Sequence, residues 1–227
     1  MTVDGRRLMR IVALAAWAAF FDYLWLSGRA LLFVGSRTHW VVPFGGIVLT
    51  LVALLQLAGL PRHRGKAVRR AEKAGLAVLL APVVAILLIP SPVLGSLAVR
   101  NKASARDLQA LSQQLKATGG PLTVYDIAIA SRDPAYATTR GMADGMTVGL
   151  SGVVSATRSG EFDLSRFKTY CCAADAIPFT IRVISDQAFK SDDWVALEGT
   201  LELADDGTWI VRARAAHVAD VDSDPYL

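Results

Sequence analysis

Three long apolar stretches near the N-terminus constrain the fold of this chain more than any other feature of its sequence. They cover about residues 11–35, 40–60 and 74–99. An α-helix rises about 1.5 Å per residue, so about 20 apolar residues cross a hydrocarbon core of about 30 Å. Each stretch is long enough. We therefore predict a transmembrane region over residues 1–99, made of three helices, followed by a domain outside the bilayer.

Positive charge is distributed unevenly around these stretches, and this distribution predicts their orientation. Between the first and second stretches the only basic residue is Arg37. The other flanking basic residues precede the first stretch or separate the second from the third: Arg6, Arg7, Arg10, Arg62, Arg64, Lys66, Arg69, Arg70 and Lys73. Cytoplasmic loops retain lysine and arginine. We therefore expect a multi-pass protein of a bacterial plasma membrane, with a cytoplasmic N-terminus and an extracytoplasmic C-terminal domain.

Two other interpretations of these stretches remain. The first stretch begins after basic residues, as a signal peptide does, but it is longer than the apolar region of a cleaved signal. The third stretch is interrupted by Pro82, Pro90 and Pro92. Proline is tolerated in a spanning helix when neighbouring groups satisfy the backbone, so a third spanning helix is our prediction and a re-entrant segment is the alternative.

The overall basic charge does not indicate a nucleic-acid partner. Residues 1–99 hold 11 lysines and arginines against three acids, whereas residues 100–227 hold 13 against 17. The basic residues are thus concentrated beside the apolar stretches, and the C-terminal part is acidic. An acidic domain lacks the positive surface that binds DNA or RNA phosphates. We expect membrane lipid, and no nucleic acid, among the partners.

Two ionisable residues fall inside the first apolar stretch. Asp22 and Arg29 are seven residues apart, which places them about two turns apart on one helix face. A charge inside a membrane is costly and often marks a pathway or a contact with a partner. We predict that they are intramembrane docking groups; alternatively, Arg29 reaches the outer interface and Asp22 pairs with it.

After the third stretch the sequence changes character. We expect residues 100–140 to form a linker with short helices, one of them near 122–130, and residues 141–227 to form a small all-β domain. Alternating apolar residues and hairpin turns predict five short strands, over 147–154, 167–172, 179–184, 194–203 and 208–215. Such a pattern favours an OB-like barrel, with an open antiparallel sandwich as the alternative.

The chemically distinctive segment of the β domain is Cys171-Cys172-Ala173-Ala174-Asp175, which holds both cysteines of the chain. Adjacent residues of a strand point to opposite faces, so one thiol is expected to face the barrel interior and the other solvent. Three interpretations remain open: simple packing of buried cysteines, oxidation of an exposed thiol, and metal binding by Cys171, Cys172, Asp175 and His217. The spacing does not choose among them.

Several segments of the chain resemble the YcgQ-type membrane proteins, an uncharacterised family whose members accompany a YcgR-type permease. The N-terminal resemblance lies in residues 26–33, 51–57 and 90–101. The C-terminal resemblance is more specific and lies in residues 150–154, in Cys-Cys-Ala-Ala-Asp-Ala at 171–176, in Asp193-Trp194-Val195 and in Asp224-Pro225-Tyr226. The alanine-rich stretch 127–142 departs from the family pattern.

The resemblance implies a place in metal homeostasis, with zinc as the ion, beside the permease. Our functional hypothesis is therefore a membrane-anchored accessory subunit of a YcgR-type permease, whose β domain binds or presents a substrate such as zinc. The alternative is a thiol-based redox protein or a ligand-binding module of the outer face without a transport role. We expect no enzyme, because no nucleophile has a base near it in sequence and no glycine-rich phosphate loop is present.

Overall fold

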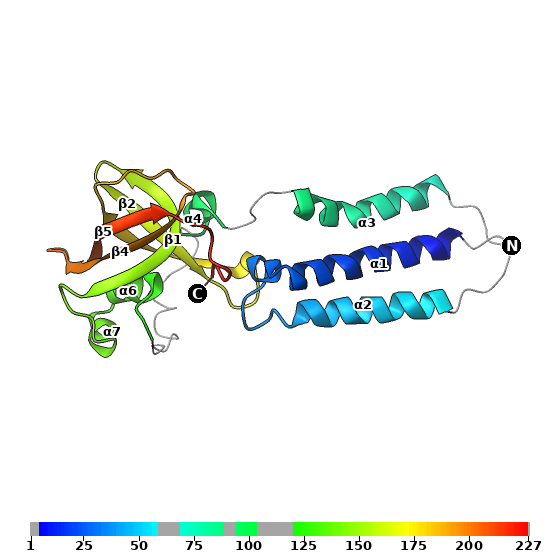
Figure 1. Ribbon diagram of the computed structural model, residues 1–227, viewed down its shortest axis with the longest axis horizontal. Coiled ribbons are helices and arrows are strands. Elements are labelled where there is room, and N and C mark those ends of the chain that lie inside the picture. The colour runs from blue at the N-terminus through cyan, green and yellow to red at the C-terminus, as the bar shows by residue number, and fades with distance from the viewer. Residues whose placement is uncertain (1–4, 59–68, 89–93, 104–119, 227) are drawn as a thin grey trace. The chain divides into compact units, whose positions relative to one another are not determined.

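The computed structural model describes residues 5–58, 69–88, 94–103 and 120–226 (Figure 1). The chain divides into two compact units, residues 1–92 and 93–227. The first unit is helical and the second contains the β-sheet, so each unit is built on its own core.

Three helices of the first unit are long and apolar enough to cross a membrane, as the sequence predicts. These are α1 (Gly5–Leu26), α2 (Val41–Ala58) and α3 (Arg70–Leu88), with a short 3₁₀ helix η1 (Arg29–Leu32) after α1. Most of their large apolar side chains are exposed, which suits lipid as the surrounding medium. A small cluster packs the helices together: Phe20, Leu24, Ala30, Val42 and Val83.

Two of the helices differ in extent from the predicted stretches. The α-helix α1 ends at Leu26 rather than near residue 35, because Gly28 adopts a φ of +72°, which an α-helix does not continue through. The expected third helix over 74–99 is α3, which ends at Leu88, and a separate helix α4 (Ser96–Ala103) follows. Pro90 and Pro92 lie between the two, where proline disfavours a continuous helix.

An ion pair joins the first turns of α1 and α3. The guanidinium Nε of Arg6 lies 2.8 Å from the Glu72 carboxylate. Because both residues are near the N-terminal ends of their helices, α1 and α3 run in the same direction. The chain therefore returns through α2.

The second unit is a five-stranded sheet that closes on itself, as predicted for an OB-like fold. Its spatial order is β1-β2-β3-β5-β4, and β4 pairs with β1. All neighbouring strands are antiparallel except β3 and β5. The strands are β1 (Thr147–Arg158), β2 (Glu161–Lys168), β3 (Ile177–Ile184), β4 (Trp194–Leu203) and β5 (Trp209–Val218).

Two short helices precede the sheet. The helix α6 (Val124–Ala130) lies near the expected 122–130, and α7 (Pro134–Thr139) follows it. Thr123 and Asp126 form a capping box at the start of α6, and every residue of α6 is buried in the barrel core. Within the expected linker, residues 104–119 lie outside the described residues.

Candidate functional site

The double-cysteine segment lies in the loop between β2 and β3, not in a strand. The expected strand over 167–172 is mostly wrong: β2 begins at Glu161 and stops at Lys168, so the two share only residues 167 and 168, and a 3₁₀ turn η2 (Ala173–Asp175) leads into β3. The two thiols consequently do not take the opposite faces of a sheet. Both cysteines are thiols, with Cys171 exposed and Cys172 partly buried.

The Asp175 carboxylate explains why the strand ends here. Its Oδ1 accepts a hydrogen bond from the Tyr170 backbone N–H at 3.0 Å. Its Oδ2 accepts from the N–H groups of Cys171 and Cys172, at 2.8 and 3.4 Å. Three consecutive N–H groups thus converge on one side chain, where a strand would point them alternately to its two sides. The loop therefore folds around Asp175.

This folding brings together three of the four residues predicted to bind metal. The Sγ atoms of Cys171 and Cys172 and a carboxylate oxygen of Asp175 lie within 4.8 Å of one another. The neighbouring Cys172, followed by partial desolvation and the Asp175 carboxylate, holds the pKa of the Cys171 thiol above its ordinary value. Deprotonation of these thiols places negative charges close to the Asp175 carboxylate, and the charges repel one another. A bound cation would offset this repulsion.

The cluster fits three ligands of a zinc ion. Thiolate and carboxylate ligands sit about 2.0–2.3 Å from tetrahedral zinc, and so about 3.5–3.8 Å from one another. The observed spread needs only a small closure to reach that arrangement. A carboxylate offers about four hydrogen-bond acceptor positions. Backbone N–H groups use three of those on Asp175, so one remains to bind an ion. Three protein ligands would leave the fourth position of the ion open.

His217 does not belong to this group of three. It is exposed on β5, where it pairs in register with Ala196 of β4. It lines a surface hollow of about 580 Å³ over β1, β4 and β5, together with Gly149, Leu150, Ser151, Ala196, Leu197, Glu198 and Ala215. His217 is therefore accessible from that hollow. The role of His217 as a metal ligand stays a prediction.

The two ionisable residues of the first apolar stretch lie on different elements. Asp22 is on α1, and its carboxylate rests so close to Gly46 of α2 that a Cβ there would be 2.7 Å from it. Arg29 is in η1, outside the α-helix, with its guanidinium 6.0 Å from the centre of the Tyr23 ring. No ion pair joins the two among the described residues.

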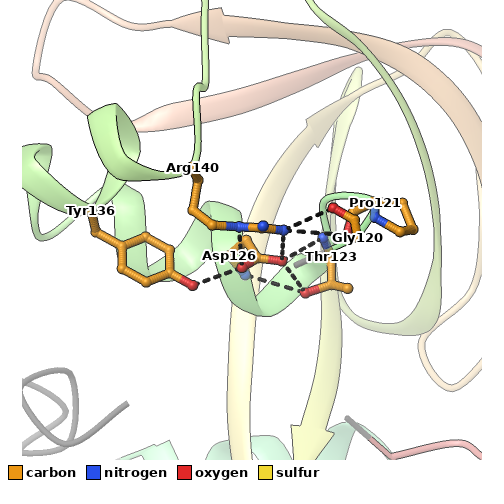
Figure 2. Close-up of polar contacts among 6 residues, drawn as sticks. All are labelled: Gly120, Pro121, Thr123, Asp126, Tyr136 and Arg140. Atoms are coloured by element: carbon orange, nitrogen blue, oxygen red, sulfur yellow. Dashed lines mark hydrogen bonds and ion pairs between the residues drawn. The ribbon is translucent and has the colours of Figure 1, made fainter. Parts of the chain in front are cut away.

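A buried polar network lies around Asp126 of α6 (Figure 2). Its carboxylate accepts hydrogen bonds from the Thr123 N–H and hydroxyl, at 2.9 and 2.8 Å, and from the Tyr136 hydroxyl at 2.7 Å. Arg140 adds Nε at 3.0 Å and Nη2 at 3.3 Å. Every acceptor position of the carboxylate is used, so the network ties the parts of the 120–140 segment to one another and leaves no group for a ligand. Sequence reasoning missed it, although Thr123-x-x-Asp126 before an apolar run is a capping-box signal.

A second network holds the C-terminal segment against the sheet. Arg166 of β2 donates to the Asp222 carboxylate at 2.6 Å and to the backbone carbonyl of Asp224 at 3.0 Å. Its guanidinium also lies 5.0 Å from the centre of the Trp194 ring. These contacts give Arg166 a structural role.

Residues 143–219 match the family model described as the DUF1980 C-terminal domain. The match covers all five strands and the cysteine loop, and it supports the expected likeness of the β domain to an uncharacterised family. No curated protein matches the chain.

Two solved structures are weakly similar to the chain. One is the crystal structure of the telomere capping protein Ten1 from Saccharomyces pombe, with 14% identity, 45% of this chain and 82% of that chain covered, and a TM-score of 0.27. The other is the crystal structure of the S. pombe Stn1–Ten1 complex, with 13% identity, 46% and 80% covered, and a TM-score of 0.27. At such low scores neither likeness bears on function.

Proposed function

We propose that this protein is a membrane-anchored metal-binding subunit that presents zinc to a permease of the YcgR type. The observation that supports this most is the convergence of two thiols and one carboxylate within 4.8 Å on an accessible loop. Thiolate and carboxylate are both zinc ligands, and an incomplete protein ligand set leaves a position through which the ion can be exchanged.

The raised pKa of Cys171 argues against thiol chemistry as the role of this loop. Reactive and redox-active cysteines have lowered pKa values, because the thiolate is the attacking species. Here the neighbours of Cys171 oppose thiolate formation. A divalent cation supplies the opposite charge that the cluster lacks, so the same geometry that makes a poor nucleophile makes a suitable cation site.

Metal analysis of the full-length chain tests this proposal directly. The protein is purified in detergent under reducing conditions, loaded with zinc and freed of unbound ion. We expect one zinc per chain, and its loss in Cys171→Ser and Cys172→Ser. Asp186→Asn removes an exposed carboxylate outside the loop and should keep the zinc. A wild-type chain without stoichiometric zinc, or cysteine variants that retain it, would contradict the proposal.

The orientation belongs to the same proposal. The basic residues that flank the helices favour a cytoplasmic N-terminus, and three crossings then put the β domain and its thiols outside the cytoplasm. A C-terminal reporter that is active only in the cytosol should remain silent. A strong signal would show that the loop works in a reducing compartment, and presentation from the outer face would have to be abandoned.

The permease contact is the remaining part of the proposal. Asp22 and Arg29 are both exposed in the helical unit, and charged groups facing lipid need a partner. We assign the two as docking groups for the permease. A tagged chain should recover the permease from detergent extracts, and Asp22→Asn and Arg29→Met should reduce the recovery. Arg37→Met, which changes a loop residue, is the matched control.

A further inference from the structure

The helix α4 packs on the side of the barrel that carries the cysteine loop. It begins at Ser96, after the seven residues that follow α3. Its Val99 is buried in one cluster with Val153, Phe167 and Trp194 of the sheet. The same cluster contains Ala176, and Ala173 packs against it, so residues of the cysteine loop and of α4 share one apolar contact.

The N-terminal end of α4 is held by Asp192, from the loop between β3 and β4. The Ser96 N–H donates to the Asp192 Oδ1 at 2.6 Å. That carboxylate lies so close to Gly95 that a Cβ at this position would overlap it. Asp192 is also the one non-glycine residue with positive φ, at 74°, in the described parts of the chain. An unfavourable backbone conformation is thus maintained where the carboxylate meets the helix.

The C-terminal end of α4 is held by the cysteine loop itself. The Lys102 Nζ donates to the backbone carbonyls of Ala173 and Ala174, each at 3.0 Å. These are the two residues that separate Cys172 from Asp175. The loop is therefore fixed by two side chains: Asp175 gathers its N–H groups from within, and Lys102 gathers its carbonyls from α4.

From these contacts we propose that Lys102 is a positioning residue of the metal site and that α4 is a strap whose docking on the barrel controls retention of the ion. This inference rests on the metal-binding function proposed above. With α4 docked, Lys102 holds the turn that sets Asp175 beside the thiols. With α4 displaced, the turn loses that restraint and the ion is released.

The experiment compares Lys102→Met, Lys102→Arg and Arg100→Met in the full-length protein in detergent. Arg100 is an exposed basic residue of the same helix, so its variant controls for loss of charge from α4. Zinc affinity is measured by competition with a chelator. Residues that orient metal ligands typically contribute 10–100-fold to affinity, so we expect Lys102→Met to weaken zinc binding by about that factor. Lys102→Arg should restore much of it, and Arg100→Met should match the wild type.

A second variant separates positioning from general damage to the fold. Gly95→Ala places a Cβ against the Asp192 carboxylate and should release the other end of α4. We expect it to weaken zinc binding as Lys102→Met does, while the zinc stoichiometry at saturation stays unchanged.

The outcomes distinguish the two proposals. If the wild type binds zinc and both variants bind it equally well, the strap is refuted and the metal site stands. If Lys102→Met and Arg100→Met weaken binding equally, the effect is one of overall charge and the positioning role is also refuted. If the wild type binds no zinc, both proposals fall together.

Discussion

Replacing Asp126 by asparagine should open the segment over residues 120–140 far more readily than in the wild type. The substitution keeps the size of the side chain but removes the charge that Arg140 pairs with, where the Arg140 and Asp126 side chains are only 9% and 1% exposed. One amide oxygen must then serve donors that two carboxylate oxygens now share. The amide NH₂ also faces the hydrogen-bond donors of Thr123 or Arg140.

The size of the effect follows from the contacts that remain. Removing one partner of a buried ion pair costs about 3–5 kcal/mol. We take the lower end, about 3 kcal/mol, because Arg140 Nη2 also donates to the carbonyls of Gly120 and Pro121, at 3.2 and 3.4 Å. Since 1.36 kcal/mol is a factor of ten, this corresponds to about two orders of magnitude in the opening equilibrium. Tyr136→Phe, which removes one donor, should cost about 1 kcal/mol.

Hydrogen exchange of the full-length protein in detergent measures this effect locally. The amides of α6 should exchange about a hundredfold faster in Asp126→Asn, if opening is fast and reversible. The exposed Asp186→Asn is the control, and the double variant Asp126→Asn, Arg140→Met should cost less than the sum of its parts. Unchanged exchange in α6 would refute our view that this ion pair holds the segment.

Three further outcomes are expected. The alkylation rate of Cys171 should reach its midpoint at a higher pH than that of an ordinary thiol, because the pKa of Cys171 is raised. Cys172→Ser should lower that midpoint. A wild-type midpoint below that of an ordinary thiol would contradict the geometry of the loop. Gly199→Ala should destabilise the barrel by about 1–3 kcal/mol in denaturant unfolding, because its Cβ would lie 2.5 Å from the backbone carbonyl of Arg212. Arg166→Met should speed proteolysis of the C-terminal segment by releasing its carbonyls, and cleavage at the wild-type rate would show that other contacts hold it.

The fold was largely predictable because its signals are local. Apolar length fixes the three helices, and alternation of apolar and polar residues fixes the strands, with β4 found over the expected 194–203. The ends were less predictable. The end of α1 depends on one glycine with positive φ, and the end of β2 depends on a carboxylate seven residues further along the chain.

The candidate site was predictable only in part, since its sequence signal is the double cysteine itself. Lys102 contacts the loop across 71 residues of sequence, and Asp192 contacts α4 across 96. Nothing in the spacing of these residues indicates that they meet. The relative position of the thiols was predicted wrongly for the same reason: strand alternation assumes a hydrogen-bonded ladder, and here Asp175 takes the N–H groups that a ladder would need.

The charges around the loop favour a divalent ion over other occupants. When both thiols are deprotonated to bind an ion, they and Asp175 carry three negative charges within 4.8 Å. A divalent cation balances two of these negative charges. The Lys102 ammonium, which donates to the adjacent carbonyls, contributes the positive charge that balances the third. A loaded site with docked α4 is thus close to neutral, and displacement of α4 leaves it negative. Since the thiols must lose protons to bind the ion, the zinc affinity of the wild type should fall as the pH is lowered.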